Sequence, residues 1–300
     1  MKQSIQIFKS GSLKQLLLAV LLLFFSCQEI FSQEPDSSKV KSPGLFVGIT
    51  GGMLQSQILN TGMLTIANTV SNKMNGMTGT LEAGYFFSNW FGLSTGISYT
   101  SYKGQLTLAS YQNKFNTTDS ENETYERQVT GTAITENQNI GMVSIPLYLN
   151  FILPLGNKLG FFVQTGMEAA IPILKTYQSS GAFTFKGFYT AYNVLLQNLP
   201  AYGFPSNAAI TTNGSLKLNS LCLSAIATAG FDLFIQEKMQ LGIAATYSQS
   251  LSGISAYTQP DKFQLSTDIN QINSLMGGSS QATIQSIGVK ISLRYFFGKQ

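Results

Sequence analysis

The segment that most constrains the fold is residues 283–297, TIQSIGVKISLRYFF, near the end of the chain. Side chains that follow one another along an extended strand point to opposite sides. One side of this strand would carry only apolar and aromatic residues from Ile287 to Phe297, and the other would carry Lys290 and Arg294. A strand with one face suited to hydrocarbon and an aromatic end is typical of the closing strand of a transmembrane β-barrel.

The same alternation recurs in earlier parts of the chain, which gives eight expected strands. The other seven are residues 44–54, 77–87, 90–102, 140–153, 159–171, 217–235 and 239–252. The connections between successive strands alternate between long and short, as in barrels with long extracellular loops and short periplasmic turns. We therefore predict an all-β fold, an eight-stranded antiparallel up-and-down transmembrane β-barrel of the outer-membrane type, with both termini periplasmic.

Two details refine this prediction. Pro146 falls inside an expected strand and cannot donate a hydrogen bond to a neighbouring strand, so we expect a bulge or a missing bond there. Aromatic residues cluster beside the short turns and the C-terminus, where they would form a girdle at one membrane interface. The expected girdle comprises Phe86, Phe87, Trp90, Phe91, Phe151, Phe161, Phe162, Phe231, Phe234, Phe296 and Phe297.

The N-terminus has the layout of an export signal. Lysines precede an apolar run from Leu16 to Phe25, which is too short to span a bilayer as a helix. We predict a signal peptide over residues 1–32, a periplasmic leader over residues 33–43 and the barrel domain over residues 44–300. The alternative to cleavage after Ser32 is lipidation of Cys27. Cleavage after Ser32 would leave Cys222 as the single cysteine, so the fold must be held without an internal disulfide.

Composition bears on the environment of the barrel. Removing residues 1–32 leaves 15 basic and 13 acidic residues, a net charge of +2, which does not favour a nucleic-acid partner. Only 11% of the residues are charged, against about a quarter in a typical soluble domain. The alternative of a soluble lipocalin-like barrel, with apolar residues inside, would have an outer wall too poor in charge for good solubility.

The charged residues in the middle of the expected strands all fall on the lumen face. They are Glu82, Glu168, Asp232, Lys290 and Arg294. Enclosed charges should pair, because an isolated buried charge is costly. We expect a salt-bridge network that plugs and rigidifies the lumen. A proton or ion path is the alternative, although eight strands leave an interior only wide enough for side chains.

The long connections, rather than the barrel wall, are where a binding role would reside. One of them is rich in aromatic residues and is our candidate loop interaction surface for a protein partner, glycan or lipid headgroup. Its residues are Phe183, Phe185, Phe188, Tyr189, Tyr192, Tyr202 and Phe204. The same residues could instead extend the barrel strands or fold over the mouth of the barrel.

Catalysis and cofactor binding find little support in the sequence. Histidine, the usual general base of serine and aspartate hydrolases, is absent. The carboxylates between Asp119 and Glu123 lack the glycine and the bidentate acid of a dedicated calcium loop. We predict no enzyme activity, no cofactor and no metal site.

The segment from Val143 to Asn150, Val-Ser-Ile-Pro-Leu-Tyr-Leu-Asn, is similar to the proline-containing fourth strand of the PorT-like family. The eight-strand layout and the glycine-rich strands resemble that family as well. The resemblance implies an integral protein of the Gram-negative outer membrane, and some relatives are linked to protein secretion. We expect a monomer in outer-membrane lipid that acts as a structural, interaction or secretion-associated protein through its loops. The alternative is a narrow porin-like barrel that transports or binds a small solute.

Overall fold

The computed structural model describes residues 44–61, 71–156, 158–236, 238–257, 263–278 and 281–297. The expected signal peptide, the periplasmic leader and Cys27 lie outside these residues. The described part of the chain contains no helix with the length and hydropathy needed to cross a bilayer. The strands are β1 (Leu45–Thr61), β2 (Ser71–Phe86), β3 (Phe91–Thr118), β4 (Thr124–Pro154), β5 (Leu159–Tyr189), β6 (Val194–Leu196), β7 (Ala208–Ser215), β8 (Cys222–Gln236), β9 (Met239–Ser250) and β10 (Gln281–Phe296).

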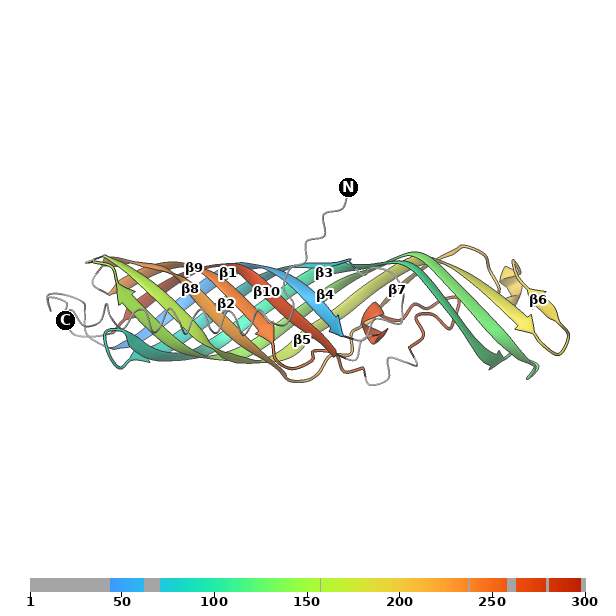
Figure 1. Cartoon of the computed structure of the whole chain (residues 1–300), viewed down its shortest axis with the longest axis horizontal. Helices are drawn as coiled ribbons and strands as arrows, with labels where there is room; N and C mark the ends of the chain where they lie inside the picture. Colours follow the sequence, from blue (N-terminus) through green and yellow to red (C-terminus); the bar gives the residue numbers. More distant parts are fainter. Residues whose placement is uncertain are drawn as a thin grey trace. The chain divides into compact units, whose positions relative to one another are not determined.

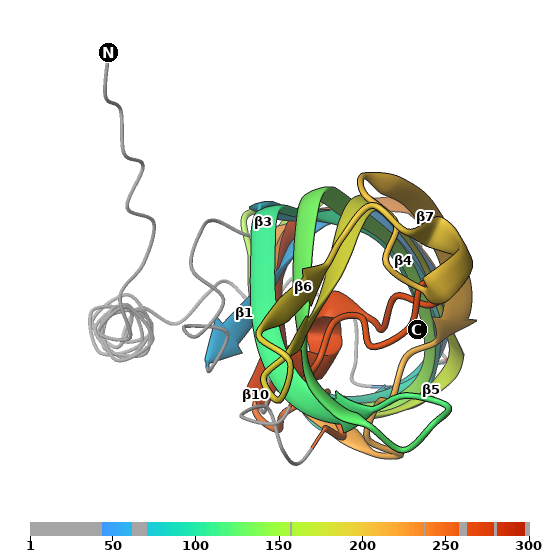
Figure 2. The ribbon, with the colours of Figure 1, turned by 90° about the vertical axis from the view of Figure 1, so that its right-hand side faces the viewer.

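Eight of these strands close into a ring (Figures 1 and 2). Neighbours are antiparallel and follow the order β1, β2, β3, β4, β5, β8, β9, β10. β10 returns to β1 along its whole length, from Phe46 opposite Phe296 to Thr61 opposite Gln281. The predicted eight-stranded antiparallel barrel is confirmed, with residues 283–297 at the seam.

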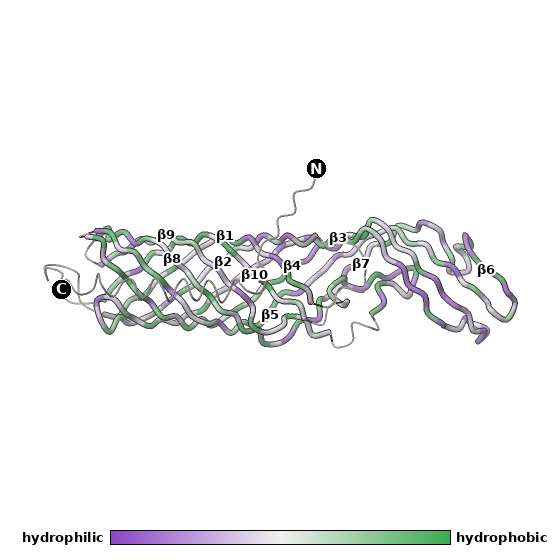
Figure 3. The backbone as a smooth tube through the Cα atoms, viewed as in Figure 1, coloured by the Kyte–Doolittle hydropathy of each residue, from purple (hydrophilic) through white to green (hydrophobic). Residues whose placement is uncertain are grey.

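The two faces of the ring have the predicted polarity. Ile291 on β10, Ile97 on β3 and Leu81 on β2 point outward and are 56%, 62% and 64% exposed. Thr80 and Thr228 point inward and are buried. Hydropathy accordingly alternates along these strands (Figure 3). Because a water-soluble barrel would place these aliphatic side chains inside, this surface is suited to lipid.

Pro146 interrupts one ladder, as expected. β3 and β4 pair at Thr95 opposite Leu147 and again at Ser98 opposite Ser144, without pairs in between. The hydroxyl of Thr95 donates a 2.7 Å hydrogen bond to the Pro146 carbonyl and so satisfies that acceptor. The register is unchanged across the gap, so the proline removes bonds without displacing the strand.

The aromatic girdle requires a partial correction. Phe87 and Trp90 are exposed on the outer wall, and Phe151 packs against Phe91 with ring centroids 5.4 Å apart. Phe86, Phe162 and Phe296, however, do not face lipid. They pack inside the ring around the buried Phe46 and close its short-turn end. Successive side chains of a strand point to opposite faces, and the positions of these three residues turn them inward. Proximity to a turn in the sequence does not indicate which face a residue occupies.

Two expected loops are largely strand. β4 and β5 each have 31 residues, whereas about 10 suffice to cross a membrane. The polar residues 103–139 form a hairpin of β3 and β4, and the first part of residues 172–215 continues β5 (Figure 1). β7 and β6 pair with the outer part of β5. We use the name extension for the part of β3 after Tyr102, the part of β4 before Ile140 and the part of β5 after Leu174. The extension also includes β6 and β7.

The last long connection folds inward. Residues 263–278, which we call the strap, contain the 3₁₀ helix η5 (Leu275–Gly278). The apolar side chains of Leu265, Ile272 and Leu275 are fully buried against the inner face of the extension. Viewed along the barrel, this part of the chain lies within the outline of the ring (Figure 2). The strap thus covers the apolar inner face of the extension.

Candidate functional sites in the lumen and the extension

Three of the five predicted lumen charges meet inside the ring. Nη1 of Arg294 on β10 lies 3.4 Å from Oδ2 of Asp232 on β8, and its Nη2 lies 3.9 Å from Oε2 of Glu82 on β2. All three side chains are buried. Gly48 on β1 lies in register between Glu82 and Arg294, and a Cβ there would come within 3.0 Å of the arginine side chain. The glycine leaves the space in which these charges approach one another.

Uncharged polar side chains extend this cluster across the lumen. Glu82 Oε1 accepts hydrogen bonds from Ser94 on β3 at 2.5 Å and from Gln164 on β5 at 3.0 Å. Gln164 also donates to Asn150, and Asn150 donates to Ser94. These bonds link β2, β3, β4 and β5 through their inner faces. Because buried polar groups are costly unless they are bonded, the network fixes the strands relative to one another.

Glu168 and Lys290 do not join this cluster. Glu168 lies beside Pro146 in the β4–β5 register and accepts a 3.1 Å hydrogen bond from Ser144. Lys290 lies between Gly52 and Ala244 in register. Within the lumen, Lys290 attracts both Glu168 and Glu82 electrostatically. Lys290 therefore couples Glu168 to the Arg294 cluster through electrostatic attraction.

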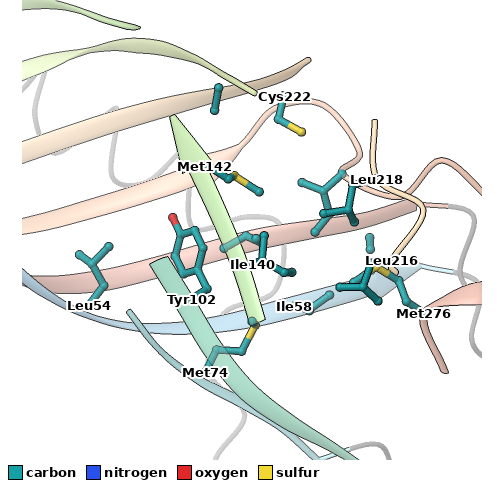
Figure 4. Packing of buried hydrophobic residues seen from close by; sticks show 14 residues of the cluster. Leu54, Ile58, Met74, Tyr102, Ile140, Met142, Leu216, Leu218, Cys222 and Met276 are labelled. Atoms are coloured by element: carbon teal, nitrogen blue, oxygen red, sulfur yellow. The ribbon is translucent and has the colours of Figure 1, made fainter. Parts of the chain in front are cut away.

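Apolar layers lie on both sides of the charges. At the short-turn end, the guanidinium of Arg294 lies over the rings of Phe46 and Phe162, 5.6 and 5.2 Å from their centroids. Toward the extension, a second cluster fills the interior with side chains from the barrel wall and the strap (Figure 4). It includes Tyr102, Ile140 and Met276. Side chains thus occupy the lumen at three successive levels.

A buried carboxylate that the sequence analysis missed joins the extension to the strap. Glu136 on β4 is fully buried and accepts four hydrogen bonds of 2.6–2.8 Å, from Gln138, Ser179, Ser274 and the backbone N–H of Leu275. Burial raises the pKa of this carboxyl above its usual value. The sequence does contain an indication of this burial. Every second residue from Ile134 to Ile140 points inward, and Glu136 occupies one of these positions.

The candidate loop interaction surface separates into buried and exposed parts. Phe183, Phe185 and Phe204 are buried and cannot contact a partner, which corrects their assignment to a surface. Phe188 and Tyr189 are half-buried. Tyr192 and Tyr202, in contrast, are 62% and 75% exposed. Phe183 and Phe185 alternate along β5, so the regular strand turns them toward the strap, whereas Phe204 packs against Tyr125.

Three exposed aliphatic residues accompany the two exposed tyrosines. Val194, Leu195 and Leu199 lie between them in sequence and are 44%, 43% and 37% exposed. We call Tyr192, Val194, Leu195, Leu199 and Tyr202 the apolar tip. The aliphatic members were not part of the predicted surface, which comprised aromatic residues alone.

Arg127 on β4 holds the segment that carries the apolar tip. Its guanidinium lies 5.0 Å from the centroid of the Phe185 ring and donates to the Gly203 carbonyl at 3.4 Å. Tyr125 stacks on Tyr189 with centroids 5.0 Å apart, and the Tyr189 hydroxyl donates to Asp119 at 2.9 Å. The exposed apolar residues are therefore presented on a well-packed support.

The ring, its apolar outer wall and its polar interior define the class of this protein, an eight-stranded transmembrane β-barrel of the outer-membrane type. No family model and no curated protein matches the chain. Among solved structures it is similar to the neisserial surface protein NspA, with 9% identity, a TM-score of 0.36 and coverage of 86% of this chain and 100% of that one. It is also similar to the outer-membrane protein OprG of Pseudomonas aeruginosa, with 16% identity, a TM-score of 0.37 and coverage of 86% and 98%. For Ail, the attachment invasion locus protein of Yersinia pestis, the identity is 10%, the TM-score 0.30 and the coverage 84% and 99%.

Proposed function

We propose that this chain is a non-enzymatic interaction protein of the Gram-negative outer membrane that captures a partner outside the cell. Both termini of the barrel would be periplasmic, and the extension would project from the outer surface. The length of the connections supports this orientation, because outer-membrane barrels have short periplasmic turns and longer external segments. The similarity of residues 143–150 to the PorT-like family supports the same location.

The apolar tip is the observation that carries the proposal. Residues 187–216 contain no charged side chain, and within them five large apolar residues are exposed on a part of the molecule beyond the membrane-crossing strands. Contiguous exposed apolar patches are uncommon on protein surfaces in water, and those that occur often mark interaction sites. The neighbouring turn between β3 and β4 differs sharply, because it carries Asp119, Glu121 and Glu123. We infer that the tip recognises an uncharged, partly apolar protein surface.

The direct test is affinity capture from detergent-solubilised outer membranes with a tip variant. Replacing Tyr192, Leu195 and Tyr202 by serine should abolish capture of the partner and leave barrel assembly intact. A matched control replaces Gln112, Asn116 and Thr211 by alanine, since these exposed side chains lie elsewhere on the extension. Capture of the same partners by wild-type protein and the tip variant would refute the proposal.

Transport of a small solute is the alternative function, and the filled lumen disfavours it. Aromatic, charged and apolar layers succeed one another inside the ring, and the strap covers the inner face of the extension. We therefore expect no steady conductance in planar bilayers. A large and persistent conductance of the wild-type protein would favour the transport function instead.

A further inference from the structure

Exposed lysines border the apolar wall where the extension begins. On β2, β3 and β5, the first exposed charged side chain above the apolar wall is a lysine. Lys73, Lys103 and Lys175 are all exposed. They follow lipid-facing residues of the same strands at short intervals, for example Ile173 on β5, which is 61% exposed.

The acidic residues of the extension lie elsewhere. Glu136 is buried beneath the strap, and the others lie in or beside the turn that joins β3 to β4. Asp119 is 16 residues beyond Lys103 along β3, which corresponds to roughly 50 Å of extended strand. The border of the apolar wall thus carries lysines, whereas the far end of the extension carries both signs, with Lys114 3.6 Å from Glu126.

Neutral polar side chains cover the sheet beside these lysines. One row crosses four strands in register, Gln105, Asn137, Gln178 and Asn213, and Lys73 lies at its end on β2. All five side chains are exposed. The amide of Gln105 donates to Asn137 at 3.1 Å, so the row already forms a chain of hydrogen-bonding groups.

Two further rows flank the first. The row nearer the apolar wall is Lys103, Asn139, Thr176 and Ser215, and the row farther from it is Thr107, Thr135, Ser180 and Thr211. Side chains in register on neighbouring strands lie about 5 Å apart, so the three rows make one continuous surface of amides, hydroxyls and lysines. We call these three rows, with Lys73 and Lys175, the polar face.

We propose that the polar face binds the phosphorylated sugar headgroups of glycolipids in the outer leaflet. This inference rests on the orientation proposed above. The face continues directly from the lipid-contacting wall, at the level where headgroups replace hydrocarbon chains. Its lysines match phosphate in charge, and its amides and hydroxyls can both donate to and accept from sugar hydroxyls. The absence of acidic side chains from these rows removes any repulsion of an anionic headgroup.

The test titrates the full-length mature protein in detergent with lipopolysaccharide that carries a phosphorylated core, and measures bound lipid by native mass spectrometry. Dephosphorylated lipopolysaccharide and phosphatidylglycerol are the comparison probes, because they separate sugar from charge. Replacing Lys73, Lys103 and Lys175 by glutamine should weaken binding of the phosphorylated probe on the order of 100-fold, since each lysine near an anionic surface contributes about a fivefold factor. The control variant Lys114→Gln, Lys158→Gln, Lys238→Gln makes the same change in charge at other exposed sites and should bind as the wild type does.

A second variant tests the contribution of the neutral rows. Replacing Gln105, Gln178 and Asn213 by alanine should weaken binding of lipopolysaccharide and leave binding of phosphatidylglycerol unchanged. Equal binding by wild-type protein and the lysine variant would overturn the inference, as would equal losses in the lysine variant and its control. Wild-type binding of phosphatidylglycerol as tight as that of lipopolysaccharide would overturn it as well.

Orientation is checked separately, so that the two proposals can fail independently. A Thr211→Cys variant in a Cys222→Ala background should react with a membrane-impermeant thiol reagent on intact cells. Labelling together with unchanged binding by the lysine variant refutes the polar-face inference alone. Absence of labelling on intact cells, with labelling after lysis, refutes the orientation and the inference together.

Discussion

The backbone N–H of Leu275 donates a 2.7 Å hydrogen bond to Oε2 of Glu136, which precedes it by 139 residues. The bond joins the strap to the inner face of β4. Ser274, the residue before Leu275, donates to the other carboxylate oxygen at 2.8 Å. One buried side chain therefore holds two consecutive strap residues, and this contact decides whether the interior of the extension is covered.

Replacing Glu136 by glutamine should release the strap. The amide keeps one acceptor oxygen, while its NH₂ group faces donors that include the fixed N–H of Leu275. An unsatisfied buried donor costs about 1–3 kcal/mol. The native thiol of Cys222, which is buried in the cluster that also contains Met276, is a direct reporter of this change. We expect faster alkylation of Cys222 in Glu136→Gln than in the control Gln271→Glu, and equal rates would contradict the assigned role.

The attachment of the strap should depend on pH. Burial raises the pKa of Glu136 from 4.5 in the folded state, so this state holds the proton more tightly than a state with the strap detached. The resulting stabilisation is complete below about pH 4.5 and is lost as the pH rises through the folded-state pKa. Spin labels at Gln271→Cys and Asn213→Cys, in a Cys222→Ala background, should show a broader distance distribution at pH 8 than at pH 4. The dependence should vanish in Glu136→Gln.

The lipid-facing side of β10 can be tested with Ile291→Arg. Ile291 lies near the middle of the outward-facing run from Ile287 to Phe297, so an arginine would enter the hydrocarbon region. The expected cost is about 2–4 kcal/mol in the free energy of folding into liposomes. Gln112→Arg, on the outer part of β3, should change this free energy by less than about 0.5 kcal/mol. Equal folding of the two variants would contradict the assignment of faces.

Arg294→Met should destabilise the barrel more than any single change at its surface. It leaves Glu82 and Asp232 buried together without their cation, and removal of one partner of a buried ion pair costs about 3–5 kcal/mol. The triple variant Glu82→Gln, Asp232→Asn, Arg294→Met should recover most of this stability, because no charge then remains in the cluster. Urea unfolding in micelles measures both variants, and a triple variant as unstable as the single one would show that the effect is not electrostatic.

Residue order and chemical type by themselves were enough to identify the class of fold. Alternation in residues 283–297 and in seven other segments predicted eight strands, and the lipid-facing polarity of Ile97 and Ile291 followed from the same period. The prediction was possible because a membrane-crossing strand faces lipid on one side and a polar lumen on the other. Apolar and polar residues therefore alternate along it. Pro146 was located in advance for an equally local reason, since its missing N–H is a covalent property.

Tertiary structure decided what lies beyond the membrane and how the interior is filled. Residues 103–139 were expected to be a loop because they are polar, yet they form a long hairpin whose inner face is covered by residues from 265 to 276. The pairing of Glu136 with Leu275 and the burial of Phe183 depend on that long-range packing. Outside the bilayer both faces of a strand can be polar, so local hydropathy carries little information there. The contacts of the strap, across more than a hundred residues of chain, determine which side chains are buried and which form the exposed tip.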